Sequence, residues 1–214
     1  SWKLAATLQG WGGPGLLASY EIERRQIGAR NVDASRHASR GRRAWRSAYR
    51  PNMRDNTLEG AETRANLTRI AEVEQRKSNE MIGAELGYVY GGSPVIWPEP
   101  GDPPEPDFMK YVPTTWPGAR LPHVWLNDGR ALHDCIGDGY TLLRLAGTQA
   151  DMSGLAPAFA AYGAPLTVLE IGDERPRELY GYDLLLVRPD LHVVWRGNRL
   201  PADPARLAAL ATGH

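Results

Sequence analysis

Cysteine is nearly absent from this sequence, in which Cys135 is the single thiol among 214 residues. One thiol excludes an internal disulfide, and it also excludes Cys-x-x-Cys redox chemistry within the chain. Proteins that form no disulfide are typical of reducing compartments, so we expect a cytoplasmic protein.

Net charge and long apolar runs are also missing. The chain carries 25 basic and 25 acidic residues, so its overall field steers it neither toward nucleic acid nor toward an anionic membrane. No apolar run approaches the roughly 20 residues that a membrane-spanning helix needs. We therefore expect neither nucleic acid nor a membrane as a partner.

Metal-binding motifs are lacking as well. His123 and His133 lie ten residues apart with Asp134 beside the second, but no ligands recur at metal-binding spacing on one helix or turn. We interpret these two histidines as structural residues held by hydrogen bonds. His192 alternates with Val193 and Val194 on a predicted strand, and we expect it at the surface.

Two other candidate sites are weak. Cys135 has His133 two residues away as a possible base, yet nothing supplies an oxyanion site, so we predict a buried structural thiol. The turn from Gly12 to Gly15 has neither a preceding strand nor the Gly-Lys-Ser/Thr ending of a phosphate-binding loop. We interpret this turn as a break between two helices.

Residues 1–90 are predicted to be helical, because apolar residues recur there at helical spacing and no strand-like alternation appears. One helix covers residues 1–8, a second runs from Leu16 to about Val32, and a third continues from Asn56 toward Ile82, with room for a break near Ser78-Asn79. Asn56 followed by Glu59 three residues later is typical of a capping box.

Proline then dominates residues 91–118, where eight prolines occur. Proline removes a backbone donor and fixes φ, so this segment is predicted to be an extended connector and a domain boundary.

Beyond residue 118 the apolar period changes to that of alternating strands and helices. The predicted order is strand, helix, strand, hairpin and helix, which is the order of a thioredoxin-like α/β layer. The final helix is predicted to be capped by Asp203 with Pro204 in its first turn. The predicted strands cover residues 140–145, 165–171, 183–188 and 192–196, and the helices cover 153–162 and 205–211.

Arginine is the strongest local bias, with ten arginines between residues 24 and 54 against one interior acid, Asp33. Together with Trp45 and Tyr49 they could bind phosphates and stack on bases. They could instead pair with the Glu-rich stretch of residues 59–74 or with a further domain, or attract the phosphates of a nicotinamide cofactor. The sequence leaves these uses open.

Both ends of the sequence contain motifs of one known family. The motifs in the opening helix pair are Trp2-Lys3-Leu4-Ala5, Leu16-Leu17 and Ser19-Tyr20-Glu21. This helix pair resembles the one that follows the second flavin-binding motif in FAD-dependent aromatic hydroxylases, the single-component flavoprotein monooxygenases of phenols and polyketides. The run from Pro117 to Gly129 and the segment Leu186–Asp190 resemble the thioredoxin-like domain of the phenol-type enzymes. Further matches are His133-Asp134, residues 137–143, residues 194–197 and, as in the chlorophenol and polyketide branch, residues 85–94.

This resemblance implies the C-terminal portion of a monooxygenase that uses FAD and NAD(P)H to hydroxylate phenol-like or polyketide rings. It implies that residues 1–90 complete the FAD and substrate domains and that residues 119–214 form a thioredoxin-like domain without redox cysteines. The flavin motifs of the family are absent, so we assign no catalytic, cofactor-binding or metal-binding residue to this chain. Alone, it is expected neither to bind FAD nor to hydroxylate a substrate.

The implied partners are the protein's own N-terminal FAD-binding half, an aromatic small molecule and a second copy in a homodimer. Trp2 and its helix would pack behind the flavin site, so replacing Trp2 or Leu4 with Ala is expected to destabilise the complex with that half by a few kcal/mol. The alternatives are a non-catalytic thioredoxin-like adaptor with a helical arm and, less favoured, a nucleic-acid binder that uses the arginine cluster.

Overall fold

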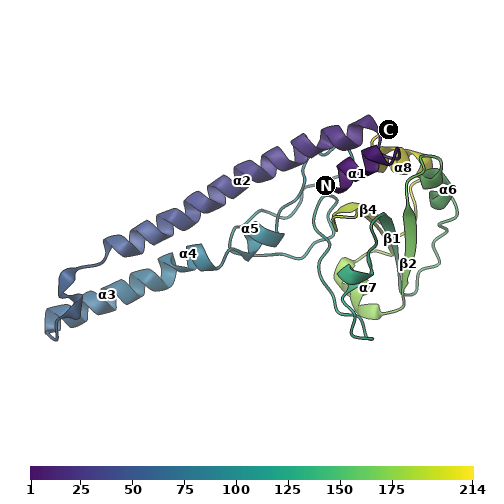
Figure 1. The fold of residues 1–214 in the computed structure, drawn as a ribbon. Helices are drawn as coiled ribbons and strands as arrows, with labels where there is room; N and C mark the ends of the chain where they lie inside the picture. Colours follow the sequence, from purple (N-terminus) through teal and green to yellow (C-terminus); the bar gives the residue numbers. More distant parts are fainter. The chain divides into compact units, whose positions relative to one another are not determined.

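The computed structural model describes all of residues 1–214, which form two compact units. The first unit contains residues 1–26, 89–104 and 113–214, and the second contains residues 27–88 and 105–112. Helix α2, Pro14–Ser47, begins in the first unit and ends in the second (Figure 1). No helix combines the length and the apolar character needed to cross a membrane.

A four-stranded sheet lies at the centre of the first unit (Figure 1). Its strands are β1 (Tyr140–Leu145), β2 (Leu166–Ile171), β3 (Leu184–Val187) and β4 (Val193–Gly197), in the order β2-β1-β3-β4. Strands β1 and β2 are parallel, whereas β3 is antiparallel to both β1 and β4. The α/β fold with a thioredoxin-like layer, including the β3–β4 hairpin, is thereby confirmed.

Three helices accompany the sheet: α6 (Leu155–Ala160), α7 (Glu174–Tyr180) and α8 (Pro204–Thr212). The predicted cap of α8 is confirmed, because Asp203 accepts a hydrogen bond from the backbone N–H of Arg206. Helix α7 was not predicted, since it is only seven residues long and contains a proline. A 3-10 turn, η2 (Leu132–Cys135), precedes the sheet.

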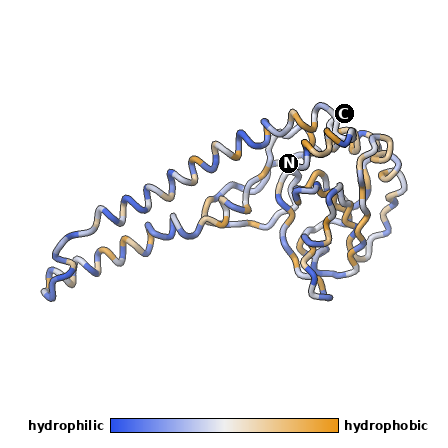
Figure 2. The backbone as a smooth tube through the Cα atoms, in the orientation of Figure 1, coloured by the Kyte–Doolittle hydropathy of each residue, from blue (hydrophilic) through white to orange (hydrophobic).

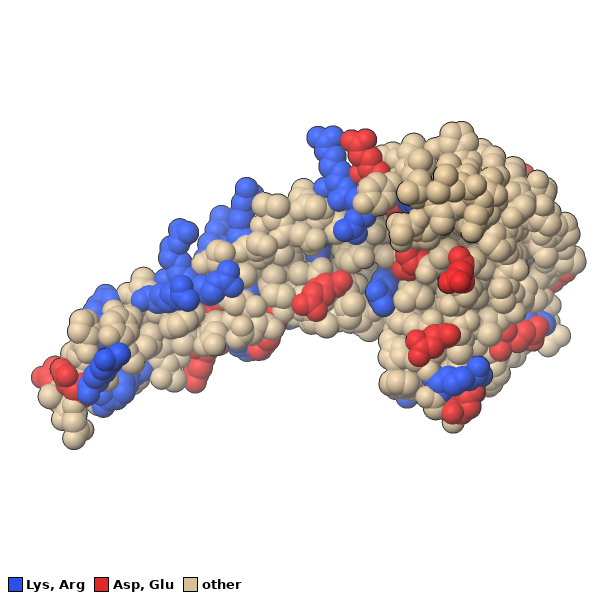
Figure 3. Space-filling model, viewed as in Figure 1, with Lys and Arg blue, Asp and Glu red and all other residues tan.

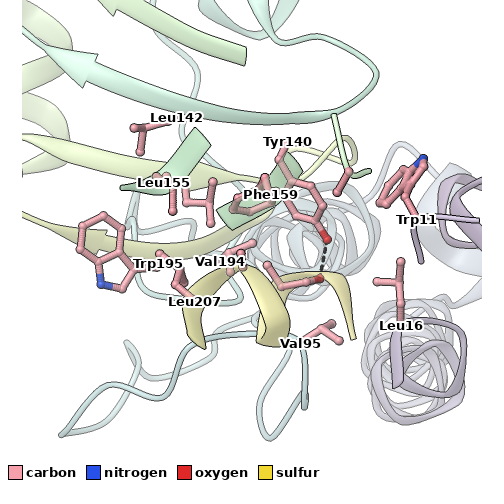
Figure 4. Close-up of a cluster of buried hydrophobic side chains, with 14 of the residues drawn as sticks. Trp11, Leu16, Val95, Tyr140, Leu142, Leu155, Phe159, Val194, Trp195 and Leu207 are labelled. Atoms are coloured by element: carbon pink, nitrogen blue, oxygen red, sulfur yellow. Dashed lines mark hydrogen bonds between the residues drawn. The ribbon is translucent and has the colours of Figure 1, made fainter. Parts of the chain in front are cut away.

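Both faces of the central strands β1 and β3 are buried, which explains why these two strands are almost continuously apolar. Tyr140 and Leu142 of β1 point into one core, which also holds Phe159 and Trp195 (Figure 4). The alternate residues Leu143 and Leu145 point into a second core on the opposite face. Burying each leucine contributes about 1.5–3 kcal/mol, so the two cores together fix the strand register. The other members of the second core include Leu121, Leu132, Leu185 and Val187.

Helix α1, Trp2–Leu8, and the start of α2 belong to the first core, to which Ala6, Trp11 and Leu16 contribute. The predicted break between the two helices is confirmed. Within it, the backbone N–H groups of Gly13 and Gly15 donate to the carbonyls of residues 212 and 213 at the end of α8.

The proline-rich stretch lies partly against strand β4 in the first unit. The N–H groups of Trp97 and Gly118 donate to the carbonyls of Val194 and Val193 at 2.9 and 2.8 Å. A segment that uses few donors can therefore still be anchored to an edge strand, whose backbone groups need partners. The boundary at residues 91–118 stays a prediction.

The second unit is helical. After α2 it contains the 3-10 turn η1 (Pro51–Arg54) and helices α3 (Leu58–Glu74), α4 (Arg76–Asn79) and α5 (Ile82–Leu86). The prediction that the second helix ends near Val32 was wrong, because α2 continues to Ser47. Its inner face carries small residues there, so the apolar pattern fades, as the mixed colours of α2 in Figure 2 show.

The predicted third helix is divided into α3, α4 and α5. Its start was predicted one residue too early, because the cap is Thr57 rather than Asn56. The Thr57 hydroxyl accepts a hydrogen bond from the N–H of Gly60 at 3.1 Å. Hydroxyl and amide side chains cap helices almost equally well, so sequence alone does not decide between neighbours of this kind.

Candidate functional site

The greatest concentration of buried charge lies where the first two helices meet the β3–β4 hairpin, all within the first unit. It consists of Lys3 on α1, Glu23 on α2, and Arg188 and Asp190 of the hairpin, and we call these four residues the charge network. Lys3, Glu23 and Arg188 are buried to within 4% of full burial. Charged side chains are almost never this buried unless they are paired.

Glu23 is the hub of the charge network. One carboxylate oxygen accepts from Arg188 Nη1 at 2.6 Å and from the Ser93 hydroxyl at 2.7 Å. The other accepts from Lys3 Nζ at 2.6 Å and from Arg188 Nη2 at 3.2 Å. Lys3 also donates to the Ser19 hydroxyl at 2.6 Å. Each buried charge therefore has a partner of the opposite sign.

Arg188 joins this hub to the hairpin turn. Its Nε and Nη2 donate to the two oxygens of Asp190 at 3.0 and 2.6 Å, which is a bidentate pair. The rings of Trp2 and Tyr90 each lie 5.3 Å from the guanidinium carbon, so cation–π contacts add to the pairing. Trp2 Nε1 donates to Asp190 Oδ2 at 2.9 Å, which ties the first helix to the turn.

Desolvation and pairing oppose each other at the acids of the charge network. Burial by itself raises the pKa of Glu23, but the charge of Arg188 and the hydrogen bonds from Arg188, Lys3 and Ser93 outweigh it, so this pKa lies below its usual value. Burial likewise raises the pKa of Asp190, and Arg188 and His192 more than reverse the effect. Both carboxylates therefore stay ionised at neutral pH.

The basic groups of the charge network stay paired as well. Burial and repulsion from Arg188 lower the pKa of Lys3, against which Glu23 acts by a hydrogen bond and by its charge. Two cations therefore face two anions in the charge network. Its arrangement serves to hold two helices on the thioredoxin-like layer.

His123 and His133, which the sequence offered as possible metal ligands, lie next to each other. His133 lies 2.8 Å through Nε2 from the Leu121 carbonyl, and its ring contacts that of His123 at 5.2 Å between centroids. Burial lowers the pKa of His133. No group of three or more His, Cys, Asp or Glu side chains is placed to hold a metal ion.

The expectation that His192 lies at the surface was wrong. Only 3% of this residue is exposed, and Nδ1 lies 2.9 Å from the Asp190 carbonyl. Its ring centroid lies 4.5 Å from that of Tyr90. The alternation of His192 with Val193 and Val194 suggested an outward face, but the chain segment around Tyr90 covers that face.

Cys135 is half-buried rather than fully buried as predicted. It lines a small cavity of about 200 Å³ beside the end of β2, together with Leu126, Arg130, Leu169 and Asp173. Its Sγ lies 3.6 Å from the Ala131 carbonyl. No base lies within hydrogen-bonding distance of the sulfur, so the nucleophile interpretation gains no support.

Sequence reasoning missed the charge network. Lys3 and Glu23 lie on helices, where charged residues normally face solvent, and Arg188, which pairs with Glu23, is 165 residues away in the sequence. The segment Arg188-Pro189-Asp190 was noticed only as a family word and a turn. The available signal was that its two opposite charges flank a proline between two apolar strands.

Both ends of the chain match models of known protein families. The family model described as "Aromatic-ring hydroxylase, C-terminal" matches residues 114–213, and the model described as "FAD binding domain" matches residues 1–35. The chain is 35% identical to the FAD-dependent monooxygenase apdD of Emericella nidulans, with 99% of the chain covered. It is 30% identical to the phenol 2-monooxygenase of a Pseudomonas species, with 95% covered.

Among solved structures, the rebeccamycin biosynthetic enzyme RebC with reduced flavin superposes with a TM-score of 0.87 and 34% identity over 99% of the chain. The chain spans only 36% of the length of apdD, 38% of the phenol 2-monooxygenase and 39% of RebC. Because these relatives are monooxygenases, the alternatives of an adaptor module and a nucleic-acid binder are not favoured.

Proposed function

The chain belongs to the family of FAD-dependent aromatic-ring hydroxylases, whose C-terminal part it matches, and on this premise we propose that it works within a monooxygenase that hydroxylates phenol-like or polyketide rings with FAD and NAD(P)H. The proposal is supported by two relatives, the FAD-dependent monooxygenase apdD and the phenol 2-monooxygenase of the Pseudomonas species. Bound FAD would supply the oxygen-transfer chemistry.

The 214 residues by themselves do not offer a flavin site. The buried cations Lys3 and Arg188 are already paired with carboxylates and are not available to a diphosphate. The N–H groups of Gly13 and Gly15 donate to the end of α8 instead of forming a phosphate cradle. We therefore place the FAD-binding residues in another part of the longer protein and assign no catalytic, cofactor-binding or metal-binding residue here.

One observation carries the proposal. The buried Glu23–Arg188 pair joins the segment matched by the FAD-binding model to the segment matched by the C-terminal model, with two hydrogen bonds of 2.6 and 3.2 Å. A thioredoxin-like domain of residues 119–214 that is locked to flavin-domain helices in this way is an integral part of the enzyme. Its role would be to hold those helices in place.

The opening helix offers a surface to the rest of such an enzyme. Leu4 and Leu8 are 52% and 80% exposed, and Tyr20 on α2 is 53% exposed. Leu4 and Leu8 lie one turn apart on the same face of α1, and exposed apolar side chains that lie together mark a surface that another domain covers. We propose that the N-terminal FAD-binding half is that domain.

The test compares this chain with the complete product of its gene. We expect the 214-residue chain to be colourless and the complete protein to show a flavin absorption spectrum and to consume NAD(P)H when a phenolic ring is added. Stoichiometric flavin on the short chain would contradict the placement of the cofactor site. A complete protein that binds flavin but hydroxylates no aromatic ring would contradict the activity.

We also propose a cytoplasmic homodimer. The outer edge of strand β2 is not paired with another strand, and Val168 on it is 41% exposed, so the edge needs cover. Sedimentation of the complete protein at the mass of two copies would agree with the proposal, and a monomer at micromolar concentration would contradict it.

A further inference from the structure

One face of helix α2 carries a row of arginines. Arg36, Arg40, Arg43 and Arg46 recur at intervals of four, three and three residues, so their side chains leave the same side of the helix. We call these four residues the arginine face. They are all exposed, and they span about 15 Å along the helix axis. In Figure 3 the blue side chains gather along α2.

The opposite side of α2 is packed within its own unit, which fixes the orientation of the row. Ala34 and Ala38 are buried, and a Cβ on Gly41 would lie only 2.4 Å from the Glu74 carbonyl oxygen. Ser78 donates to the Ala38 carbonyl at 3.2 Å. The helix therefore cannot rotate its arginines inward without losing these contacts.

The chain does not neutralise the arginine face. Asp33 pairs with Arg36 at 2.8 Å, but both side chains are more than half exposed, so this pair contributes little. Arg40 and Arg43 take part in no ion pair. Neither arginine pairs with a glutamate of residues 59–74, of which Glu74 pairs with Lys77. Of the uses that the sequence left open, pairing of the arginine cluster with that stretch is therefore not observed at these two positions.

From this geometry we infer that the arginine face is a docking surface for an acidic partner protein. Guanidinium groups match carboxylates bidentately, and a helical row at this spacing fits carboxylates that recur along one side of a helix. A row of about 15 Å on a convex helix is too long and too open for a small phosphate ligand, which prefers a concave site.

Single-stranded nucleic acid fits the arginine face less well than an acidic protein does. It would need aromatic rings interleaved with the cations, but Trp45 is half-buried and lies on the other side of the helix from Arg43. Its ring contacts the Arg46 guanidinium, at 5.7 Å, at one end of the row. The chain as a whole is also neutral. The inference is independent of the proposed hydroxylase activity.

The test uses two labelled peptides of about 20 residues and fluorescence anisotropy. One peptide places glutamates along one helical face at intervals of three and four residues, and the other is its scramble with the same composition. We expect the patterned peptide to bind several-fold more tightly than the scramble and to lose affinity between about 50 and 200 mM salt.

Variants locate the binding. The double variant Arg40→Gln/Arg43→Gln is expected to weaken binding of the patterned peptide about fivefold or more. The matched control is Arg175→Gln/Arg199→Gln, which removes the same charge from exposed positions of the thioredoxin-like layer and should leave the affinity within twofold. Because all four side chains are exposed, neither variant is expected to unfold the chain.

Three results would overturn the inference. The first is equal affinity for the patterned and scrambled peptides, and the second is tighter binding of a single-stranded oligonucleotide of similar length. The third is loss of peptide binding when the protein is produced with all the residues that its gene encodes. That result would place the acidic surface in the same polypeptide instead of in a partner.

Discussion

Arg188 shows how strongly a single buried charge depends on its partners. It is fully buried and is held by Glu23, Asp190 and two aromatic rings. A buried ion pair is not by itself strong evidence for stability, because desolvation offsets the attraction. Removing one member of such a pair destabilises the fold, because the charge that remains is buried with no opposite charge beside it.

Replacing Arg188 with Met is expected to lower the free energy of unfolding by about 3–5 kcal/mol, because Glu23 and Asp190 then stay buried without their guanidinium partner. Urea denaturation measures the change. The control is Arg36→Met, whose exposed pair with Asp33 should be worth less than about 1 kcal/mol. Equal losses for the two variants would mean that the charge network does not behave as a buried one.

Thr141 and Thr212 are both buried, but their hydroxyls differ in hydrogen bonding. The Thr141 hydroxyl is buried without a hydrogen-bond partner, whereas the Thr212 hydroxyl donates to the Ala208 carbonyl at 2.7 Å. Thr141→Val should therefore leave stability unchanged or raise it by up to about 1 kcal/mol, and Thr212→Val should lower it by about 1 kcal/mol. Thermal unfolding of both variants measures these changes in stability. A clear loss of stability in Thr141→Val would contradict the assignment, because it would mean that the Thr141 hydroxyl has a hydrogen-bond partner.

At the scale of elements, the junction of α1 and α2 with the end of α8 depends on glycine. A Cβ on Gly13 would lie 2.4 Å from the Gly213 carbonyl oxygen, which is closer than real Cβ atoms come to backbone. Neighbouring backbone would have to move, and the hydrogen bond from Gly13 N to the Thr212 carbonyl at 2.8 Å would be disturbed.

Gly13→Ala is accordingly expected to destabilise the chain by roughly 1–3 kcal/mol. Its control is Gly28→Ala on the exposed side of α2, where a Cβ meets nothing within 4 Å, and where alanine should stabilise the helix by up to about 1 kcal/mol. Chemical denaturation of the two variants is expected to show changes in the free energy of unfolding that have opposite signs. A neutral Gly13→Ala would show that the two helices are not held this tightly to α8.

Some of the helices and strands could be predicted from the sequence, and others could not. The strands at residues 140–145 and 184–187, the β3–β4 hairpin and the Asp203 cap were predictable because apolar runs, turn residues and caps are local signals. The length of α2 was not, since its inner face is made of small residues such as Ala34 and Ala38, which carry little hydrophobic periodicity.

The site was less predictable than the fold for the same reason. The Glu23–Arg188 pair joins residues 165 positions apart, and no local pattern marks a glutamate that will be buried. The burial of His192 depends on coverage by the chain around Tyr90, which alternation along a strand cannot reveal. The resemblance to the hydroxylases identified the family, but it did not predict which side chains of the charge network contact one another.

At the scale of the whole molecule, the charge network sets the response to acid. The pKa values of Glu23 and Asp190 lie below their ordinary values of 4.5 and 3.8. A carboxylate whose folded pKa is depressed stabilises the fold above its unfolded pKa and loses that contribution as the pH falls through the folded pKa. The depressed pKa of His133 acts with the same sign below its ordinary 6.5.

Melting temperature is therefore expected to fall slightly below pH 6.5, where His133 resists protonation, and more steeply below pH 4.5. Circular dichroism between neutral pH and pH 3.5 follows both steps. His133→Gln should remove the first step and leave the second. A melting temperature that stays constant down to pH 4 would contradict the assignment of the acid response to these groups.

The hydrogen bond from Trp2 to Asp190 has a consequence for synthesis on the ribosome. Its two partners lie 188 positions apart in the chain. At roughly 5–20 residues per second, about 10–40 s pass between the synthesis of Trp2 and that of Asp190. During that interval Trp2 lacks Asp190 and Glu23 lacks Arg188, whereas Lys3 can already pair with Glu23, so the charge network is completed only once the β3–β4 hairpin has been made.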